Sequence, residues 1–439
     1  MIFKKLALAA VGATLAASAL SAVPAQAQEN GQFVPGLVYR TGPYAPGGIP
    51  WADGFADYVS LLNARDGGIN GVPLVYEECD TAYNNDKGVE CYEKLKGKGP
   101  TGGASVQPLS TGITYALMDR VRADKIPMIT SGYGRADASD GSVFEWIFTA
   151  PVTYWAGADA IVQYIEAQEK DLKGKKIALV YHDSAFGKEP IKTLQALAEK
   201  NGFKLDLFPV PHPGLEQKAT WLKIGRQLKP DWVIMWGWGV MNSTAIKEAA
   251  AVGFPMNKFV GVWWSGSEVD VRPAGMDAKG YLAAQFHGAG ANYKVHEDIV
   301  KTLYEKGKGA SDRDKVGDIL YNRGLISAVI MAEGIRTAMN KYGNKPMTGE
   351  QIRWGLENLK LDDAALDKLG LKGLMAPLQL SCKDHEGGGK VVIQQWSGAA
   401  WTPVSDWITP RRDGFLTEMY KESAAQYAKE KNITPRTCN

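Results

Sequence analysis

Five of the chain's 13 tryptophans lie in two short segments, WVIMWGWG and FVGVWWSG. An indole ring offers a large apolar face and one N–H donor, which suits the wall of a small-molecule site. Aromatic residues inside strands are usually structural, so we expect Trp232 and Trp236 to pack against helices. Trp238, Trp263 and Trp264 come last in their segments and are candidates for the wall of a ligand cleft. The glycine beside each group lets a ligand or another segment approach the backbone closely.

Residue types that perform catalysis form no convincing pattern. The phosphate-binding loop and the G-x-S-x-G motif are absent from the sequence, and HEDIV at His296 lacks the second histidine of H-E-x-x-H. His182, Asp183 and Ser184 form a suggestive group, but sequence neighbours cannot all converge on one substrate atom. The histidines follow no metal-ligand spacing, at positions 182, 212, 287, 296 and 385. We expect a binding protein without a cofactor or a metal, and a hydrolytic enzyme is a remote alternative.

The N-terminus indicates export. Lys4 and Lys5 precede an alanine-rich apolar stretch at 6–20, and an A-x-A cleavage site follows at 25–27. The stretch is shorter than the roughly 20 residues that a membrane-spanning helix needs, so we interpret residues 1–27 as a cleaved signal peptide. Cleavage removes both lysines, and the formal charge falls from +2 to neutral. A neutral chain with mixed charges has no electrostatic footprint for nucleic acid or anionic lipid, so we expect a soluble periplasmic product.

All four cysteines lie in the exported part of the chain. An even number in an oxidising compartment favours disulfides, although four cysteines allow three connectivities. A Cys79–Cys91 pair would join a strand end to the following helix, and a Cys382–Cys438 pair would fasten the C-terminal tail. The alternative is a metal site at Cys382 and His385, which would lack a second pair of ligands.

Strand and helix patterns alternate along the chain. Before residue 150, one helix carries Phe55, Val59 and Leu62 on one face, and another begins after a cap at Ser110 or Thr111. A second series follows, with helices expected near 156–168, 188–202, 219–229 and 242–253 and strands at 175–183, 204–210, 230–238 and 258–265. Such alternation predicts an α/β fold with parallel sheets covered on both faces, and two series predict two lobes.

The segment 317–340 is nearly apolar on all sides. A transmembrane span is the alternative, but four charges would be costly in lipid, so we expect a helix buried in a lobe. These charges are Asp318, Arg323, Glu333 and Arg336. Further along, 390–408 has the pattern of a hairpin that turns at Ser397-Gly398, and the charged segment 417–432 is typical of a terminal surface helix.

Five segments together resemble the type I periplasmic solute-binding proteins of the branched-chain amino acid class: TGPYAPGGIPWADGFADYVSLLN, DGGINGVPL, PLSTGITYALMDRVRADKIPMITSG, YHDSAFGKE and LSCKDHEGGG. They occur in order over nearly the whole mature chain, which makes the resemblance more specific than any one segment. It implies two doubly wound lobes that close over a small ligand and present it to an ABC permease in the inner membrane. We expect a monomer, and a sensor that reports to a membrane receptor is the alternative.

The resemblance also implies where the chain divides. Three crossover strands join the lobes, and we place the crossings near Thr149, Phe286 and Met375. The implied domains are a signal peptide at 1–27, a first lobe at 28–148 and 287–374, a second lobe at 149–286 and 375–410, and a C-terminal tail helix at 411–439.

The family's ligand positions transfer to this sequence residue by residue. PLSTG, at a helix start, implies that Leu109, Ser110 and Thr111 receive a ligand carboxylate, and free N–H groups at the positive end of a helix favour an anion there. A plain N-cap role for Ser110 is the alternative. The remaining implied positions are Ser131, Gly132 and Tyr133 of TSGYG, Tyr44 after the first strand, Phe186 of YHDSAFG, and Trp238.

One position departs from the family pattern. Members that bind α-amino acids hold the ammonium with an acidic residue just after the strand that here reads FVGVWWSG, where this chain has Trp264 and Ser265. A buried ammonium needs a counter-charge or several acceptors. Either Glu268 or Asp183 reaches the site, or tryptophan faces hold a cation, or the ligand has no ammonium. We expect a carboxylate ligand with an apolar or aromatic body, with hydrophobic amino acids as the second choice.

Overall fold

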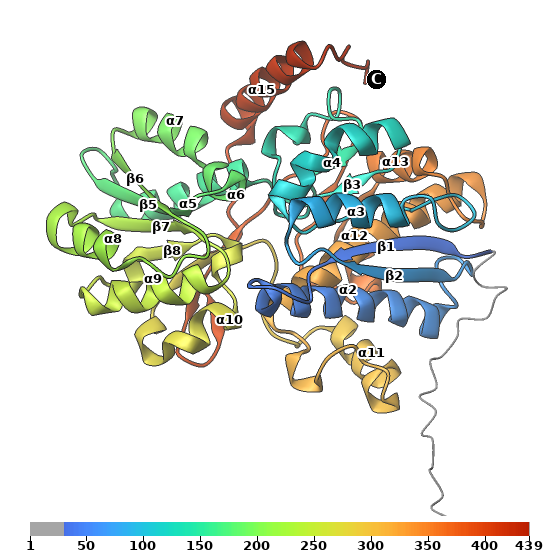
Figure 1. Cartoon of the computed structure of the whole chain (residues 1–439), viewed down its shortest axis with the longest axis horizontal. Coiled ribbons are helices and arrows are strands. Elements are labelled where there is room, and N and C mark those ends of the chain that lie inside the picture. Colours follow the sequence, from blue (N-terminus) through green and yellow to red (C-terminus); the bar gives the residue numbers. More distant parts are fainter. Residues whose placement is uncertain (1–29, 439) are drawn as a thin grey trace, which may run out of the picture.

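The computed structural model describes residues 30–438, so the expected signal peptide at 1–27 lies outside the described residues. The elements form two halves that stand side by side (Figure 1). The first half contains pairs of short strands, and the second contains one seven-stranded sheet. The alternation of strands and helices that the sequence predicts is present in both halves.

The first half is built on parallel strand pairs. β1 (Gln32–Val38) pairs with β2 (Leu74–Asp80), and β3 (Met128–Ile129) pairs with β4 (Ile147–Phe148). Strand β1 is buried along its whole length, as expected of a parallel strand covered on both faces. The other elements of this half are α2 (Ala45–Asp66), α3 (Asn85–Leu95), α4 (Thr111–Asp124), α11 (Lys294–Thr302), α12 (Ile319–Tyr342), α13 (Gly349–Glu357), α14 (Asp363–Lys368), and the antiparallel pair of β10 (Lys360–Leu361) and β11 (Leu378–Gln379).

The second half is built on one mixed sheet. Its strands are β5 (Lys176–His182), β6 (Lys204–Val210), β7 (Trp232–Trp236), β8 (Phe259–Gly261), β9 (Leu282–Gln285), β12 (Val392–Trp396) and β13 (Trp401–Pro403). Their order is β13-β12-β9-β8-β7-β5-β6, with β5 to β9 parallel and β12 antiparallel to both neighbours. Its helices are α5 (Tyr154–Glu169), α6 (Ala185–Lys188), α7 (Ile191–Asn201), α8 (Lys218–Leu222), α9 (Val240–Ala251) and α10 (Glu268–Val271). The hairpin of β12 and β13 turns where the sequence predicts it.

Strand β8 is shorter than the sequence suggests, and this changes where two tryptophans point. The strand ends at Gly261, and Trp263–Ser265 forms a single 3-10 turn instead of continuing the strand. The turn is held by the Ser265 hydroxyl, which accepts from Gly237 N at 3.0 Å and donates to Gly237 O at 2.8 Å. The expected strand to residue 265 is therefore wrong, because this side chain draws the chain out of the sheet.

The apolar segment at 317–340 forms the buried helix α12, which packs along α2. The two helices approach so closely that a Cβ atom at Gly324 would lie 1.8 Å from the Trp51 carbonyl oxygen, so a glycine is required there. Between residues 30 and 438, no helix has the length and apolar character needed to cross a membrane.

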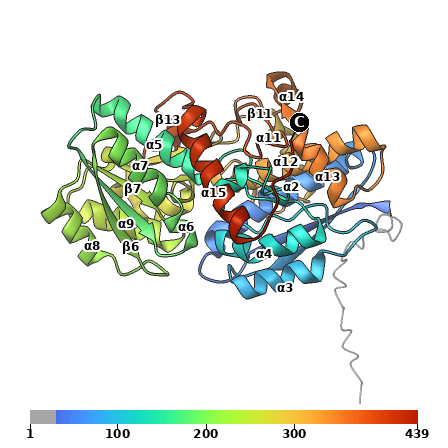
Figure 2. The ribbon, with the colours of Figure 1, turned by 90° about the horizontal axis from the view of Figure 1, so that it is seen from above.

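The chain passes between the halves after β4, after β9 and before β12, and α15 (Thr417–Glu430) then lies across both of them (Figure 2). In α15 the Tyr420 ring stacks on Trp155 of α5, with 5.4 Å between centroids. Tyr427 stacks on Phe144, just before β4, at 4.8 Å. The sequence predicts a surface helix, but one face of α15 is buried because these two tyrosines lie on the same side.

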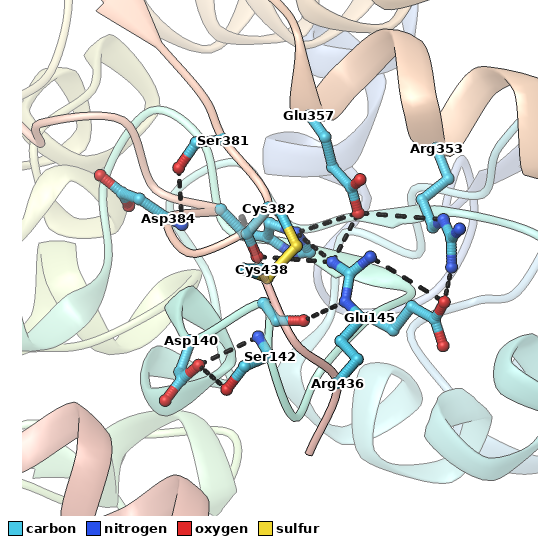
Figure 3. Close-up of a disulfide and its surroundings, with 12 residues drawn as sticks. Asp140, Ser142, Glu145, Arg353, Glu357, Ser381, Cys382, Asp384, Arg436 and Cys438 are labelled. Atoms are coloured by element: carbon cyan, nitrogen blue, oxygen red, sulfur yellow. Dashed lines mark hydrogen bonds and ion pairs between the residues drawn. A yellow bond between two sulfur atoms is a disulfide. The ribbon is translucent and has the colours of Figure 1, made fainter.

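Both disulfides join the pairs that the sequence analysis favours. Cys79 is bonded to Cys91, and Cys382 is bonded to Cys438, so no Cys382 thiolate is available for a metal. Figure 3 shows Arg436 beside the second disulfide, where it donates to Glu357 Oε1 at 2.5 Å. The end of the chain is thus held by a covalent bond and an ion pair.

Candidate ligand-binding site

A small cavity lies between the two halves. The residues that line it follow the carboxyl ends of strands, which is where open α/β sheets bind ligands. From the first half these are Tyr39, Tyr83, Leu109, Ser110, Thr111 and Tyr133, and from the second half Tyr154, Phe186, Trp238 and Trp264. The lining therefore consists mainly of aromatic rings, with hydroxyl groups on the side of the first half.

The N-terminus of α4 forms one wall of the cavity. Ser110 is its N-cap, and its Oγ accepts from Ile113 N at 3.3 Å, so the hydroxyl proton is free to donate to a ligand. Thr111 Oγ1 accepts from Gly134 N at 3.2 Å. Leu109 has a left-handed backbone with φ of +48°, a strained conformation for a residue with a side chain. The capping role and the ligand role of Ser110 are therefore compatible, because they use different parts of the hydroxyl.

Four tyrosines stand around this wall. Burial raises the pKa of Tyr39, Tyr83, Tyr133 and Tyr154 above the ordinary value, so each keeps its proton at neutral pH and can donate a hydrogen bond. The Tyr133 hydroxyl donates to Ile129 O at 2.9 Å and accepts from Leu109 N at 3.1 Å, which fixes the loop before α4. Tyr39 meets Tyr83 edge to face, with 5.0 Å between centroids, and meets Trp238 in the same way at 6.4 Å. Tyr154 stacks on Trp263.

The aromatic wall comes from the second half and is tied to the first. Trp264 Nε1 donates to Gly132 O at 2.6 Å, and Trp263 Nε1 donates to the same oxygen at 2.6 Å. Trp238 meets Trp264 edge to face, with 5.3 Å between centroids, and lies parallel to Tyr44 at 6.5 Å. Trp238 Nε1 is buried without a hydrogen-bond partner in the described part of the chain, so a ligand acceptor in the cavity could receive its proton.

A second, wider groove forms the mouth of the cleft. The Tyr44 hydroxyl bridges it, because it contacts His182 Nε2 at 2.9 Å and also hydrogen-bonds His212 Nδ1. His182 Nδ1 lies 2.8 Å from Ser184 Oγ. Burial, and then the nearby His212, lower the pKa of His182 to about 4, so this histidine is neutral at physiological pH.

The structure separates the predicted site residues into three groups. Leu109, Ser110, Thr111, Tyr133, Phe186, Trp238 and Trp264 come together around the cavity. Tyr44 lies at the mouth, while Ser131, Gly132 and Trp263 do not line the cavity. Trp263 is fully buried behind it, stacked on Tyr154 at 5.7 Å and edge to face with Phe286 at 5.5 Å. Both indole N–H groups reach Gly132 O, but only the Trp264 ring lines the cavity.

Sequence reasoning missed Tyr39, Tyr83 and Tyr154. Tyr39 directly follows β1, and Tyr83 follows β2 in a turn where its φ is +59°. Tyr154 begins α5 directly after the cap residue Thr153. An aromatic residue placed just beyond a strand end was the available signal for the first two, since that rule already selected Trp238.

Neither acidic residue considered as an ammonium clamp reaches the cavity. Glu268 Oε2 accepts from Ile319 N at 2.9 Å, at the start of α12. Asp183 forms an ion pair with Lys188 at 2.7 Å, and its side chain is 42% exposed. Trp232 and Trp236 are buried as expected, and Trp232 Nε1 donates to Glu169 at 2.9 Å. The residues that line the cavity include no carboxylate.

Comparison with solved structures shows what this architecture is similar to. A structure described as an ABC transporter permease from the Pseudomonas fluorescens group is 46% identical, with a TM-score of 0.88, and the match covers 93% of this chain and 100% of that one. A branched-chain amino acid ABC transporter protein from Thermus thermophilus with bound valine is 23% identical, with a TM-score of 0.74 over 89% and 99% of the two chains. An ABC transporter solute-binding protein from R. palustris in complex with benzoate is 18% identical, with a TM-score of 0.66 over 87% and 97%.

The similarity to these structures establishes the fold, and a match to a family model establishes the family. No curated protein sequence matches the chain. The model described as periplasmic binding protein matches residues 32–400, which contain every residue that lines the cavity. The matched family consists of binding proteins rather than enzymes. With its two halves, three crossings and a cavity between strand ends, the chain belongs to the periplasmic binding protein family and has its type I fold.

Proposed function

We propose that this protein is the solute-binding component of an ABC uptake system and that its ligand is a small carboxylate with an apolar or aromatic body. Its two halves would act as lobes at 28–148 with 287–374 and at 149–286 with 375–410, except that β11 pairs with β10 in the first half. The protein would be exported through the signal peptide at 1–27 and work as a periplasmic monomer. It would deliver its ligand to a permease in the inner membrane.

One observation carries the proposal: the cavity combines a helix N-terminus with an aromatic wall and has no carboxylate in its lining. The start of α4 offers free N–H groups and the Ser110 hydroxyl to an anion. The rings of Phe186, Trp238 and Trp264 offer apolar surface to the rest of the ligand. An ammonium would meet no counter-charge there, and leaving a buried charge unpaired is costly.

The ligands of two similar proteins agree with a carboxylate. The Thermus protein holds valine, and the R. palustris protein holds benzoate. Both ligands carry a carboxylate, but valine also carries an ammonium. The absence of an acidic residue from the lining described above favours a carboxylate ligand without an ammonium, as benzoate is, for this chain.

Binding would be coupled to closure of the lobes. The hydrogen bond from Trp264 to Gly132 and the contacts of Tyr44 with His182 join the two halves across the cleft. A ligand that contacts both lobes stabilises the closed state by its difference in affinity between the closed and open states. The closed protein would then be the form that a permease recognises.

A thermal-shift screen tests this function. The mature protein is unfolded and refolded to remove any carried ligand, and each hydrophobic amino acid is paired with the matching acid that lacks the amine. A ligand at 100 times its Kd stabilises by roughly 2.7 kcal/mol, which gives a clear rise in Tm. We expect the amine-free acids to raise the Tm. A rise with the amino acids alone would mean that Glu268 or Asp183 moves in to clamp an ammonium, and no rise with any carboxylate would overturn the proposal.

A further inference from the structure

Arg323 of α12 is a fully buried arginine that reaches from the first half to the aromatic wall of the second. Its Nη1 donates to Trp263 O at 2.8 Å, and its Nη2 donates to Gln285 Oε1 at 2.6 Å. The guanidinium carbon lies 4.6 Å from the ring centroid of Trp264 and 5.2 Å from that of Phe286. One charged group thus fixes the backbone of the tryptophan turn and sits against a ring that lines the cavity.

The charge of Arg323 is not held in an ion pair within residues 30–438. Both of its hydrogen-bond acceptors are neutral, and its buried Nε has no acceptor among the described residues. Burial lowers the pKa of Arg323 to about 9, which still leaves the group charged at neutral pH. A buried charge with only two neutral hydrogen-bond acceptors destabilises the folded state, which suggests that Arg323 is kept for a function.

The acidic group that acts most strongly on Arg323 already has its own hydrogen-bond partners. Asp270 accepts from Asn242 Nδ2 at 2.8 Å through one oxygen, and from Ser267 N at 2.8 Å and Ser267 Oγ at 2.6 Å through the other. It acts on Arg323 through space and is the main group that raises the arginine's pKa, followed by the cavity tyrosine Tyr154. The charge of Arg323 therefore lies directly behind a ring that lines the cavity, that of Trp264.

We infer that Arg323 determines specificity through Trp264: its buried charge makes the cavity favour an anionic ligand and disfavour one that carries an ammonium. The inference rests on the proposed function and goes beyond it by assigning the choice of ligand charge to a residue outside the cavity. A cation against one indole also weakens that ring as a partner for a second cation, since the ring's negative faces are what attract positive charge. The tryptophans then act as an apolar wall and not as a cage for an ammonium.

The test measures a ratio of affinities, which a general loss of packing would not change. Benzoate and benzamide have similar shapes and differ in charge, as do 4-methylpentanoate and 4-methylpentanamide. Isothermal titration calorimetry gives the Kd of both members of a pair for wild type, Arg323→Gln, Arg323→Lys and Arg336→Gln. Arg336 is a matched control, because it lies on the same helix but pairs with Glu333 at 3.1 Å and does not line the cavity.

We expect Arg323→Gln to reduce the preference for the carboxylate over its amide by about tenfold or more, because a unit charge close to the ligand is lost from a medium of low dielectric. Arg323→Lys keeps the charge and should keep the preference even where its overall affinity falls. Arg336→Gln should match the wild type. An equal loss for carboxylate and amide in Arg323→Gln would show that the arginine only holds the turn, and would overturn the inference.

A second variant carries the test if Arg323→Gln does not fold. Asp270→Asn removes the negative charge that acts most strongly on Arg323 while keeping the side-chain shape, so the preference for the carboxylate should rise. An unchanged or lower preference in this variant would contradict the inference. These outcomes differ from a failure of the proposed function, in which the wild-type protein binds no carboxylate probe at all.

Discussion

The hydroxyl of Tyr44, in the first half, lies 2.9 Å from Nε2 of His182, in the second. The same hydroxyl bonds His212, and a hydroxyl has a single proton to donate. If Ser184 donates to His182 Nδ1, then His182 donates to Tyr44, and Tyr44 donates to His212. This chain of hydrogen bonds across the mouth of the cleft uses the neutral form of His182, whose Nδ1 accepts from Ser184, so closure of the lobes is linked to pH.

The pH dependence of ligand affinity should reveal this link. The pKa of His182 is lowered from 6.5 to about 4 by burial in this structure, so a form in which this side chain is exposed to water would bind a proton that the buried form does not. The stabilisation is complete above pH 6.5 and is lost as the pH falls towards 4, with a limit on the order of 3 kcal/mol. We expect the Kd to rise over this window in wild type and to rise less in His182→Gln.

Affinity is a better readout here than thermal stability. Burial also lowers the pKa of His287 to about 3 and that of His296 to about 4, so unfolding reports three histidines together. Of these three histidines, only His182 lies at the mouth of the cleft. Identical pH profiles for wild type and His182→Gln would contradict the assignment.

Glu189 should contribute a pH dependence of ligand affinity with the opposite sign to that of His182. The Tyr115 hydroxyl of α4 donates to Glu189 across the cleft, and burial, together with Asp137, raises the pKa of this carboxyl to about 7. Its contribution to closure is present below the ordinary pKa of 4.5 and is lost as the pH rises through 7. Glu189→Gln removes the charge and should bind ligand more tightly than wild type at pH 8, with little difference at pH 5. Equal affinity of the two proteins at pH 8 would show that Glu189 does not oppose closure.

Ser110→Ala tests the anion site at the start of α4. The variant loses a hydroxyl donor to the ligand and should weaken every carboxylate by about 1–3 kcal/mol, the usual value of a hydrogen bond to a charged group. The helix also loses its N-cap, worth about 1 kcal/mol of folding stability. Calorimetry with the wild-type ligand separates the two effects, because a loss of the cap alone would lower the Tm and leave the affinity unchanged.

Trp238 and Trp232 offer a matched pair of tryptophans. Trp238→Ala should change the order of preference among ligands with different apolar bodies, because the ring lines the cavity. Trp232→Ala should lower the free energy of unfolding by about 3–5 kcal/mol and leave the order unchanged, because Trp232 is buried in the sheet of the second half. A uniform loss of affinity across all ligands in Trp238→Ala would make that ring structural.

The parts of the site that follow local rules could be predicted from sequence. Ser110 caps α4 and Trp238 follows β7, and each position is set by a few neighbouring residues. Whether Trp263 or Trp264 faces the cavity depends on the 3-10 turn whose Ser265 is bonded to Gly237, after the neighbouring strand β7, and no local pattern reveals this contact. The role of Arg323 could not be predicted for the same reason, because its contacts with the two tryptophans join α12 to a distant part of the sequence.

The C-terminal disulfide shows how a tail far from the cavity contributes to stability. Cys382 and Cys438 are 56 positions apart and Cys79 and Cys91 are 12 apart, so the first closes the longer loop. In the chain-entropy model, cross-links over such loops contribute about 4 and about 3 kcal/mol. We expect the double variant Cys382→Ser/Cys438→Ser to lose more unfolding free energy in urea than Cys79→Ser/Cys91→Ser. The reverse order would mean that Arg436 and the stacked tyrosines of α15 hold the tail without the disulfide.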